Sequence, residues 1–185
     1  LKQDYIYYYN PKNTLRFGFW NTFHVFLPGR VRPITEESII GGDELPKKRA
    51  LSQAYYINHE WKPSGRFEME YGVRLSLFSN VGVGREFVYE NGQKNFFQDG
   101  SVRPGKVIDT LFYKEGEFYN TFANLEPRLN MVYRLDSRSS VKASYNRMAQ
   151  YLHLIQNIAA STGQEFWTPS TPSIRPQIAD QVAVG

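Results

Sequence analysis

The stretch "RFEMEYGVRLSLF", from Arg66 to Phe78, alternates between two kinds of side chain. Its odd-numbered positions are apolar without a break: Phe67, Met69, Tyr71, Val73, Leu75 and Leu77. Its even-numbered positions carry Glu68, Glu70 and Arg74, together with a glycine and a serine. Because successive side chains of a β-strand point to opposite faces, a period of two is typical of strands. The stretch therefore predicts a long strand with one apolar face and one charged face.

The same period recurs along the chain. Its apolar positions are Leu15, Phe17, Phe19, Phe23, Val25 and Leu27, then Leu51, Tyr55, Ile57 and Trp61, then Leu125, Leu129, Met131, Tyr133 and Leu135, and finally Val141, Ala143 and Tyr145. With partial strands at the two ends, we predict about seven antiparallel strands and an all-β fold. Only Tyr151–Ala160 is compatible with a short helix, inside a loop. The exceptions to the pattern are Asn21, Trp20, Phe26, Arg147 and Pro127, the last of which requires a bulge or a sheet edge.

The composition agrees with strands. Of 185 residues, 13 are Tyr, 13 are Phe and 3 are Trp, so aromatic residues make up 16% of the chain. The net charge of +4 is mild and spread out, and gives no reason to expect nucleic acid. The absence of cysteine excludes a disulfide scaffold. The chain begins "LKQDYIYYYN" and ends "IADQVAVG", and we expect both ends to lie within a longer protein.

The predicted connections alternate in length. The short turns are "NPKN" (10–13), "KPSG" (62–65) and "DSRS" (136–139), and the long connections cover about 28–50, 80–117 and 148–176. In an antiparallel sheet this order puts every short turn at one end and every long connection at the other. That is the arrangement of outer-membrane β-barrels. We therefore expect the odd-numbered face of 67–77 to contact lipid and the charged face to line a wet lumen.

Aromatic residues are expected at both membrane interfaces, where their amphipathic rings concentrate. The candidates near the short turns are Trp61, Phe67 and Tyr133, and those nearer the long connections are Tyr55, Phe78 and Tyr145.

Four segments resemble a known family. The block "NLEPRLNMVYRLDSRSSVKASYNRMAQYLHLIQN" (Asn124–Asn157) and the segment "WTPSTPSIRPQIADQ" (Trp167–Gln181) are similar to barrel segments of TonB-dependent outer-membrane receptors of the large Bacteroides type. "FHVFLPGR" (Phe23–Arg30) and "YGVRLSLFSNVG" (Tyr71–Gly82) resemble the same family. Pro127 falls within "LEPR", which looks like a motif of that family.

The resemblance implies a 22-stranded barrel that is plugged by an N-terminal domain and imports a bulky nutrient (a glycan, a peptide or a metal chelate) with energy from TonB. Residues 1–185 would be part of this single barrel domain, about a third of its wall, without the plug. The implied partners are the remainder of the barrel, the plug domain, the TonB complex and outer-membrane lipid, with a surface lipoprotein left open. The implied location is the outer membrane of a Gram-negative bacterium, and neither enzymatic activity nor a cofactor is expected.

Six polar residues are expected to face the lumen: Glu68, Glu70, Arg74, Glu126, Arg128 and Arg134. Glu68 and Glu70 point the same way, roughly 7 Å apart, as in a paired-carboxylate glycosidase. We favour a simpler interpretation, in which Arg74, Arg128 or Arg134 balances their charge. The histidines His24, His59 and His153 have no metal-ligand spacing. "GVGREF" (Gly82–Phe87) lacks the third glycine of a phosphate-binding loop and is interpreted as a flexible strand exit.

The long connections hold the candidate ligand contacts. Glu86–Gly100 and Ser161–Pro172 mix aromatic rings with amides, hydroxyls and charges, which suits glycans, peptides or chelates, and we single out Tyr151 and Trp167. The simpler alternative is a solvated surface loop. Two other functions stay open at this point: a soluble β-sandwich that binds carbohydrate, and a β-rich hydrolase that uses Glu68 and Glu70.

Overall fold

The computed structural model of the chain describes residues 1–27, 47–90, 95–96, 102–103, 105–156 and 165–185. Every regular element in these ranges is a β-strand. The strands are β1 (Lys2–Asn10), β2 (Asn13–Phe26), β3 (Lys48–Trp61), β4 (Phe67–Val81), β5 (Gly84–Tyr89), β6 (Asn95–Phe96), β7 (Val102–Arg103), β8 (Val107–Tyr113), β9 (Phe118–Arg134), β10 (Ser140–Gln150), β11 (Leu152–Gln156), β12 (Glu165–Pro169) and β13 (Gln177–Val184). The described ranges contain no helix that could cross a membrane.

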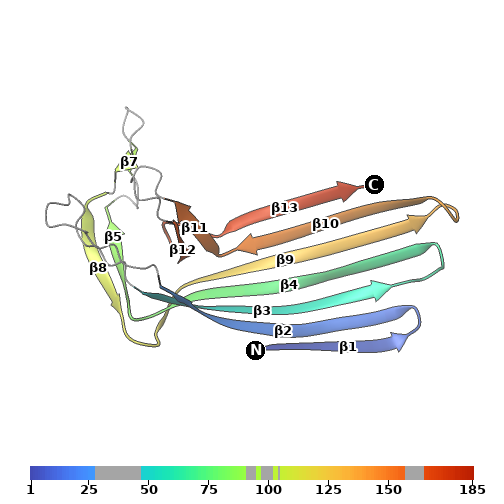
Figure 1. Cartoon of the computed structure of the whole chain (residues 1–185), viewed down its shortest axis with the longest axis horizontal. Helices are drawn as coiled ribbons and strands as arrows, with labels where there is room; N and C mark the ends of the chain where they lie inside the picture. The colour runs from blue at the N-terminus through green and yellow to red at the C-terminus, as the bar shows by residue number, and fades with distance from the viewer. Residues whose placement is uncertain (28–46, 91–94, 97–101, 104, 157–164) are drawn as a thin grey trace.

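Seven of the strands form one antiparallel sheet in the order β1-β2-β3-β4-β9-β10-β13 (Figure 1). This confirms the predicted all-β fold and the predicted number of long strands. The sheet is not closed, because β1 and β13 each have a neighbour on one side only within the described residues. All residues of β1 and β13 are exposed. Both edges therefore present unpaired backbone donors and acceptors.

The register between strands keeps the two kinds of side chain apart. Val73 lies opposite Ile57 on β3 and Pro127 on β9, whereas Arg74 lies opposite Tyr56 and Glu126. Residues that lie opposite one another share a face of the sheet. The odd-numbered residues of β2, β3, β4, β9 and β10 thus form one face, which we call the apolar face. The even-numbered residues form the polar face.

No second sheet covers the apolar face within the described residues. Ile57 is 46% exposed, Leu75 is 38% exposed and Leu125 is 59% exposed. The buried apolar residues of the described part are few: Phe26, Ala50, Ala54, Phe78 and Val81. The described part of the chain therefore has a much smaller core than an ordinary globular domain of this length.

All three short turns lie at one end of the sheet, at the right of Figure 1, where they join β1 to β2, β3 to β4 and β9 to β10. The predicted separation of short turns from long connections is confirmed. The long connections hold additional strands that the sequence did not predict, the pairs β5–β8, β6–β7 and β11–β12. Residues 152–156 form β11, so the helix considered for Tyr151–Ala160 is wrong in that part. Gly84–Phe87 begins β5, so "GVGREF" is not merely a flexible strand exit.

Pro127 lies within β9 without a bulge. Strand β9 keeps its register with β4 through Pro127, which lies opposite Val73. Its ladder with β10 covers residues 128–134 of β9 and stops at Arg128, opposite Asn146, so that Pro127 is the first residue without a partner on β10. The missing N–H of the proline therefore falls where β9 has already lost a neighbour. Of the two expectations, a local sheet edge is the one that holds.

Arg147 is an exception on the apolar face whose charge is balanced. Its Nε and one terminal nitrogen donate to the two oxygens of Asp180 on β13, at 2.8 and 2.9 Å, and the Tyr145 hydroxyl donates to the same carboxylate at 2.7 Å. Arg147 and Asp180 lie opposite each other in the ladder. The pair shields both charges, and its double hydrogen bond fixes the position of β13 against β10.

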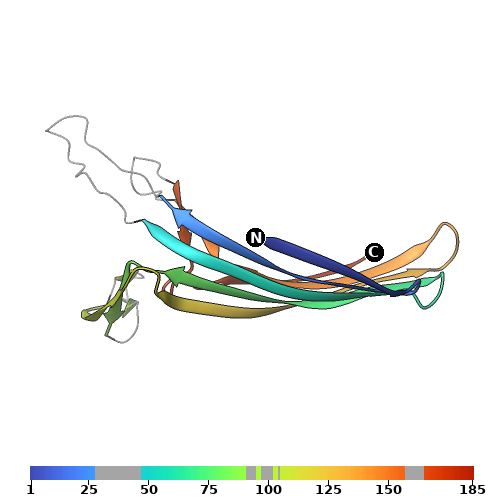
Figure 2. The same cartoon turned by 90° about the horizontal axis from the view of Figure 1, so that it is seen from below.

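The sheet is a single curved layer (Figure 2). Seen from its edge, the outer strands β1 and β13 rise to the same side of the central strands, so that the sheet forms a trough. The hairpin β11–β12 lies on that concave side, and its contacts with Phe78 and Ser76 identify this side as the polar face. The polar face is therefore the inside of the curve.

Phe78 was expected among the interfacial aromatic residues near the long connections, and that expectation is wrong. Phe78 is an even-numbered residue of β4 and lies on the polar face, where it is fully buried. It forms a small cluster with Phe26 and Ala50, covered by Tyr151 and Leu152. Trp61 and Phe67, by contrast, lie on the apolar face beside a short turn, with ring centroids 6.0 Å apart.

Replacing Gly72 by alanine tests the close approach of β3 and β4. A Cβ at Gly72 would lie 2.8 Å from Asn58 Cα and would collide with the Ile57 carbonyl, so the strands must shift. We expect Gly72→Ala to lower the free energy of unfolding by about 1–3 kcal/mol, a typical cost of overpacking. Denaturant titrations of the full-length protein, followed by tryptophan fluorescence, measure this change. Gly65→Ala is the control, because a Cβ there meets nothing within 4 Å. Equal midpoints for the two variants would contradict this account.

Candidate functional site

The polar face carries a network of ion pairs near the short turns. Glu68 lies 3.3 Å from Arg134 and 3.4 Å from Lys62. Glu70 lies 3.8 Å from Arg16, which also approaches Glu60 at 2.9 Å. Lys62 pairs with Glu60 as well. Glu68 and Glu70 are thus engaged by cations from β9, from β2 and from the turn that follows β3.

Only part of this network was predicted. Arg134 balances Glu68 as one of the three expected cations, but neither Arg74 nor Arg128 approaches Glu68 or Glu70 among the described ion pairs. Arg16, Glu60 and Lys62 were missed, although all three sit at even positions or beside a turn. Their partners come from other strands, and the pairing of strands was the signal required to find them.

Arg74, Glu126 and Arg128 form a second group in the middle of the polar face. Glu126 is only 4% exposed and lies 4.0 Å from a terminal nitrogen of Arg128. The guanidinium of Arg74 lies over the ring of Trp20, 5.6 Å from its centroid. No described carboxylate comes within 4.0 Å of Arg74, and its Nε is buried without a described hydrogen-bond partner. A charged group in this state attracts an anion.

The hairpin β11–β12 is attached to the polar face through Tyr151. The Tyr151 ring stacks on Phe78, with centroids 5.1 Å apart and planes 2° from parallel. Its hydroxyl is 2.6 Å from Ser76 Oγ and accepts a hydrogen bond from Asn124 Nδ2 at 2.8 Å. The stacking contact with Phe78 and the hydrogen bonds to Ser76 and Asn124 therefore both hold the Tyr151 side chain against the sheet.

Further contacts hold the other end of the hairpin. Asn80 Nδ2 donates to the carbonyl of Ser170 at 2.8 Å, and Lys48 Nζ donates to Thr168 Oγ1 at 3.1 Å. His153 Nε2 lies 2.9 Å from Ser170 Oγ. Thr168, Ser170 and His153 are buried. The connection is therefore docked on the strands at a row of polar contacts, and does not extend freely from them.

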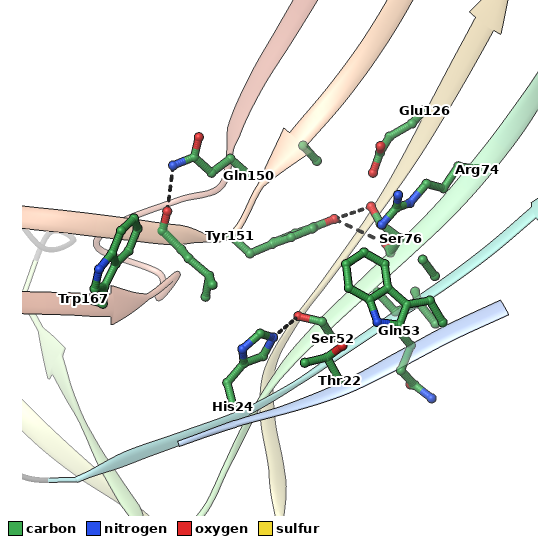
Figure 3. Close-up of a pocket in the computed structure, with 15 residues that line it drawn as sticks. Thr22, His24, Ser52, Gln53, Arg74, Ser76, Glu126, Gln150, Tyr151 and Trp167 are labelled. Atoms are coloured by element: carbon green, nitrogen blue, oxygen red, sulfur yellow. Dashed lines mark hydrogen bonds between the residues drawn. The ribbon is translucent and has the colours of Figure 1, made fainter. Parts of the chain in front are cut away.

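A cavity of about 370 Å³ lies between the hairpin and the sheet (Figure 3). The sheet contributes Trp20, Thr22, His24, Ser52, Arg74 and Glu126, and the hairpin side contributes Gln150, Tyr151 and Trp167. In Figure 3, Arg74 and Tyr151 approach each other from opposite walls. The lining combines aromatic rings, hydroxyl groups, the amides of Gln53 and Gln150, the carboxylate of Glu126 and the cation of Arg74.

A second cavity of about 310 Å³ adjoins the first along the sheet and shares Trp20 and Arg74 with it. It adds Lys2, Tyr56, Asn58 and Arg128. Lys2 pairs with Asp4 at 2.8 Å, and Tyr56 donates to the same carboxylate. Trp20 and Arg74 therefore stand at the junction of two hollows on the polar face.

The predicted contact residues Tyr151 and Trp167 are brought together in the first cavity. Trp167 is 54% exposed, whereas Tyr151 is half-buried and held by hydrogen bonds. Trp20 was noted only as an exception to the strand pattern, and its contact with Arg74 required the fold. Residues 91–94, 97–100 and 161–164 of the two predicted contact segments lie outside the described residues.

The described residues contain no group of three His, Cys, Asp or Glu side chains placed to hold a metal ion. Each histidine has another polar neighbour. His24 Nε2 is 2.9 Å from Ser52 Oγ, and His59 lies between Tyr71 and Asn13, at 2.8 and 3.0 Å.

Replacing Tyr151 by phenylalanine tests the attachment of the hairpin. The change keeps the stack on Phe78 but leaves Ser76 Oγ and Asn124 Nδ2 without their partner, at a cost of about 1–3 kcal/mol. We expect faster hydrogen exchange at the amides of β11. Tyr133→Phe is the matched control, because Tyr133 is exposed on the apolar face. Unchanged protection in Tyr151→Phe would show that the hydroxyl does not hold the hairpin.

His153 makes the same attachment sensitive to pH. Burial disfavours the charged imidazole and lowers the pKa of His153 below its ordinary value of 6.5. The undocked hairpin therefore binds a proton at higher pH than the docked one, and docking weakens as pH falls through that window. We expect protection of β11, corrected for intrinsic exchange, to fall between about pH 7 and pH 5. His153→Gln should remove this dependence, and its persistence would assign the effect to another group.

Comparison with models of protein families, with curated proteins and with solved structures gave no match for the chain.

Proposed function

We propose that the chain forms part of the wall of a TonB-dependent outer-membrane transporter. One observation carries the barrel wall: a single curved sheet whose apolar face is exposed on the convex side and whose ion pairs lie on the concave side. The TonB-dependent family is proposed from the resemblance of Asn124–Asn157 and Trp167–Gln181. In water such a face would be covered by a second layer. Facing hydrocarbon, the same side chains need no cover, and the charged residues need an aqueous interior.

The open edges support a barrel that continues beyond these strands. Unpaired backbone groups at a sheet edge cost several kcal/mol each in lipid, so a membrane sheet must close on itself. We propose that further strands of the same protein pair with β1 and β13 and complete a barrel of about 22 strands. The chain would then be stable only together with the rest of its barrel.

The proposed mechanism follows the arrangement of the two ends. The long connections would meet a bulky nutrient outside the cell, and the polar face would contact the plug domain through its ion pairs and hydrogen bonds. TonB would act on the plug from the periplasm. The remaining proposed partners are outer-membrane lipid and, for a glycan or peptide importer, a surface lipoprotein. The chain itself would do no chemistry and use no cofactor.

Two other functions receive less support. A soluble β-sandwich would pack a second sheet on the apolar face, and the described residues contain only two-stranded pairs besides the main sheet. A hydrolase that uses Glu68 and Glu70 would need a carboxylate free to exchange a proton with its substrate. Cations engage both residues.

Single-cysteine variants test the membrane orientation, since residues 1–185 contain no cysteine and any cysteine elsewhere in the full-length protein is replaced by serine. Nitroxide labels at Val73, Leu129 and Met131 lie on the apolar face, and those at Asn130 and Lys142 lie on the polar face. In the full-length protein in lipid vesicles, we expect the first set to collide mainly with dissolved oxygen, which concentrates in lipid. The second set should collide mainly with a water-soluble nickel complex.

A label at Ser137 in the short turn β9–β10 is the control, and should meet the nickel complex in either case. Equal access of the nickel complex to both faces, or an inverted pattern, would rule out the membrane wall. A detergent-independent, monodisperse monomer would then favour the sandwich.

A further inference from the structure

The unpaired charge of Arg74 sets the character of the two cavities. Three cations line them, Lys2, Arg74 and Arg128. Lys2 has Asp4 at 2.8 Å, and Arg128 has Glu126 at 4.0 Å. Glu126 lies opposite Arg74 in the β4–β9 ladder, but within the described residues no carboxylate comes within 4.0 Å of Arg74, and its buried Nε has no hydrogen-bond partner. The cavities thus retain one uncompensated positive charge, at their junction.

The surroundings of Arg74 point to a ring-shaped ligand with hydroxyl groups. Trp20 lies against the guanidinium, and Tyr151 and Trp167 stand on the opposite wall of the larger cavity. Aromatic faces pack against the C–H faces of sugar rings, while hydroxyl and amide side chains such as Thr22 and Gln150 bond to sugar hydroxyls. A volume of about 370 Å³ is in the range of small-molecule sites.

Two other ligand classes fit less well. A peptide that adds a strand needs a free sheet edge, and β3 and β4, which lie beneath Arg74, are paired on both sides. A catecholate chelate of iron gathers several negative charges around one metal, whereas a uronate oligosaccharide carries one carboxylate on each ring. The described lining holds one cation, Arg74, that has no carboxylate within 4.0 Å. A ligand with one carboxylate near its bound ring matches both the charge and the lining.

We propose that Arg74 binds the carboxylate of a sugar acid, and that the nutrient taken up is a uronate-bearing oligosaccharide. This inference rests on the transport function proposed above, because it requires the polar face to line the route of the nutrient. The planar guanidinium of Arg74 would donate two parallel hydrogen bonds to the carboxylate. A lysine ammonium cannot form this pair of parallel bonds, so it would bind the carboxylate less strongly. Trp20 would hold the guanidinium in place from behind.

Calorimetric titration of the full-length protein in detergent tests the proposal with trigalacturonate and with a neutral galactose trisaccharide of the same linkage. We expect trigalacturonate to bind about tenfold or more tightly than the neutral sugar, because a charge-assisted pair adds to the ring contacts. Arg74→Gln should remove this preference and leave the neutral sugar unaffected. Arg74→Lys should restore part of it, and Arg138→Gln, in a short turn on the far end of the sheet, should change nothing.

A second variant covers the case in which Arg74→Gln does not fold. Trp167 is exposed on β12 and should be replaceable by alanine without loss of the fold. Trp167→Ala should weaken the binding of both sugars, because both would pack a sugar ring against the Trp167 indole. An unchanged affinity for both sugars would overturn the assignment of this cavity.

Three outcomes overturn the proposal. In the first, the neutral sugar binds as tightly as trigalacturonate. In the second, an acidic peptide or a ferric catecholate binds more tightly than either sugar. In the third, Arg74→Gln lowers the denaturation midpoint and leaves the affinity for both sugars unchanged, which would show that Arg74 has a counter-ion within the protein. The spin-label measurement is independent. If the spin labels alternate between lipid and water but trigalacturonate does not bind, the proposed ligand is refuted and the membrane wall stands. If trigalacturonate binds but the labels do not alternate, the transport function is refuted and the binding site stands.

Discussion

The structure depends on the alternation of side chains across a single sheet. A strand can present only two faces, and in a one-layer sheet each face meets its own surroundings directly. The register carries the alternation across the middle of the sheet, so that Phe17, Ile57, Val73 and Leu129 share one side. It shifts only near strand ends, between Tyr8 and Asn10 on β1 and between Phe78 and Asn80 on β4. A slip of one residue in any ladder would place glutamates and arginines among those side chains. Ion pairs between neighbouring strands on the opposite face reinforce the same register.

The curvature gives the two faces different roles. On the convex side the apolar residues spread outward and stay exposed, and on the concave side the polar residues converge. Convergence is what brings Arg16 of β2 near carboxylates of both β3 and β4, and what places Trp20 of β2 beside Arg74 of β4. Polar side chains on a flat sheet would lie side by side. On the curved sheet they form a network and enclose hollows.

The hairpin β11–β12 supplies the second wall. It turns onto the concave side and covers Phe78, so the few buried apolar residues of the described part gather where connection meets sheet. Its polar contacts run through Tyr151, Ser170 and Thr168 to residues of β3, β4 and β9. The cavity beside Arg74 exists because a connection folds inward. The binding proposal and the small core thus have one structural cause.

The sequence by itself determined the strands of the seven-stranded sheet, the short turns and most of the membership of each face, because these follow from a period of two and from local turn residues. It missed the three two-stranded pairs in the long connections. It predicted the polar positions Glu68, Glu70, Arg74, Glu126, Arg128 and Arg134 as one face, and it led to Tyr151 and Trp167 as contact residues. Only the tertiary structure decided which charges pair, that Arg74 has Trp20 but no described carboxylate within 4.0 Å, that Asp180 balances Arg147, and that Phe78 is covered from the polar side. Each of these joins residues from different strands or from a connection that folds back. Alternation along a strand is a local property, whereas the choice of partner depends on curvature and on segments distant in the chain.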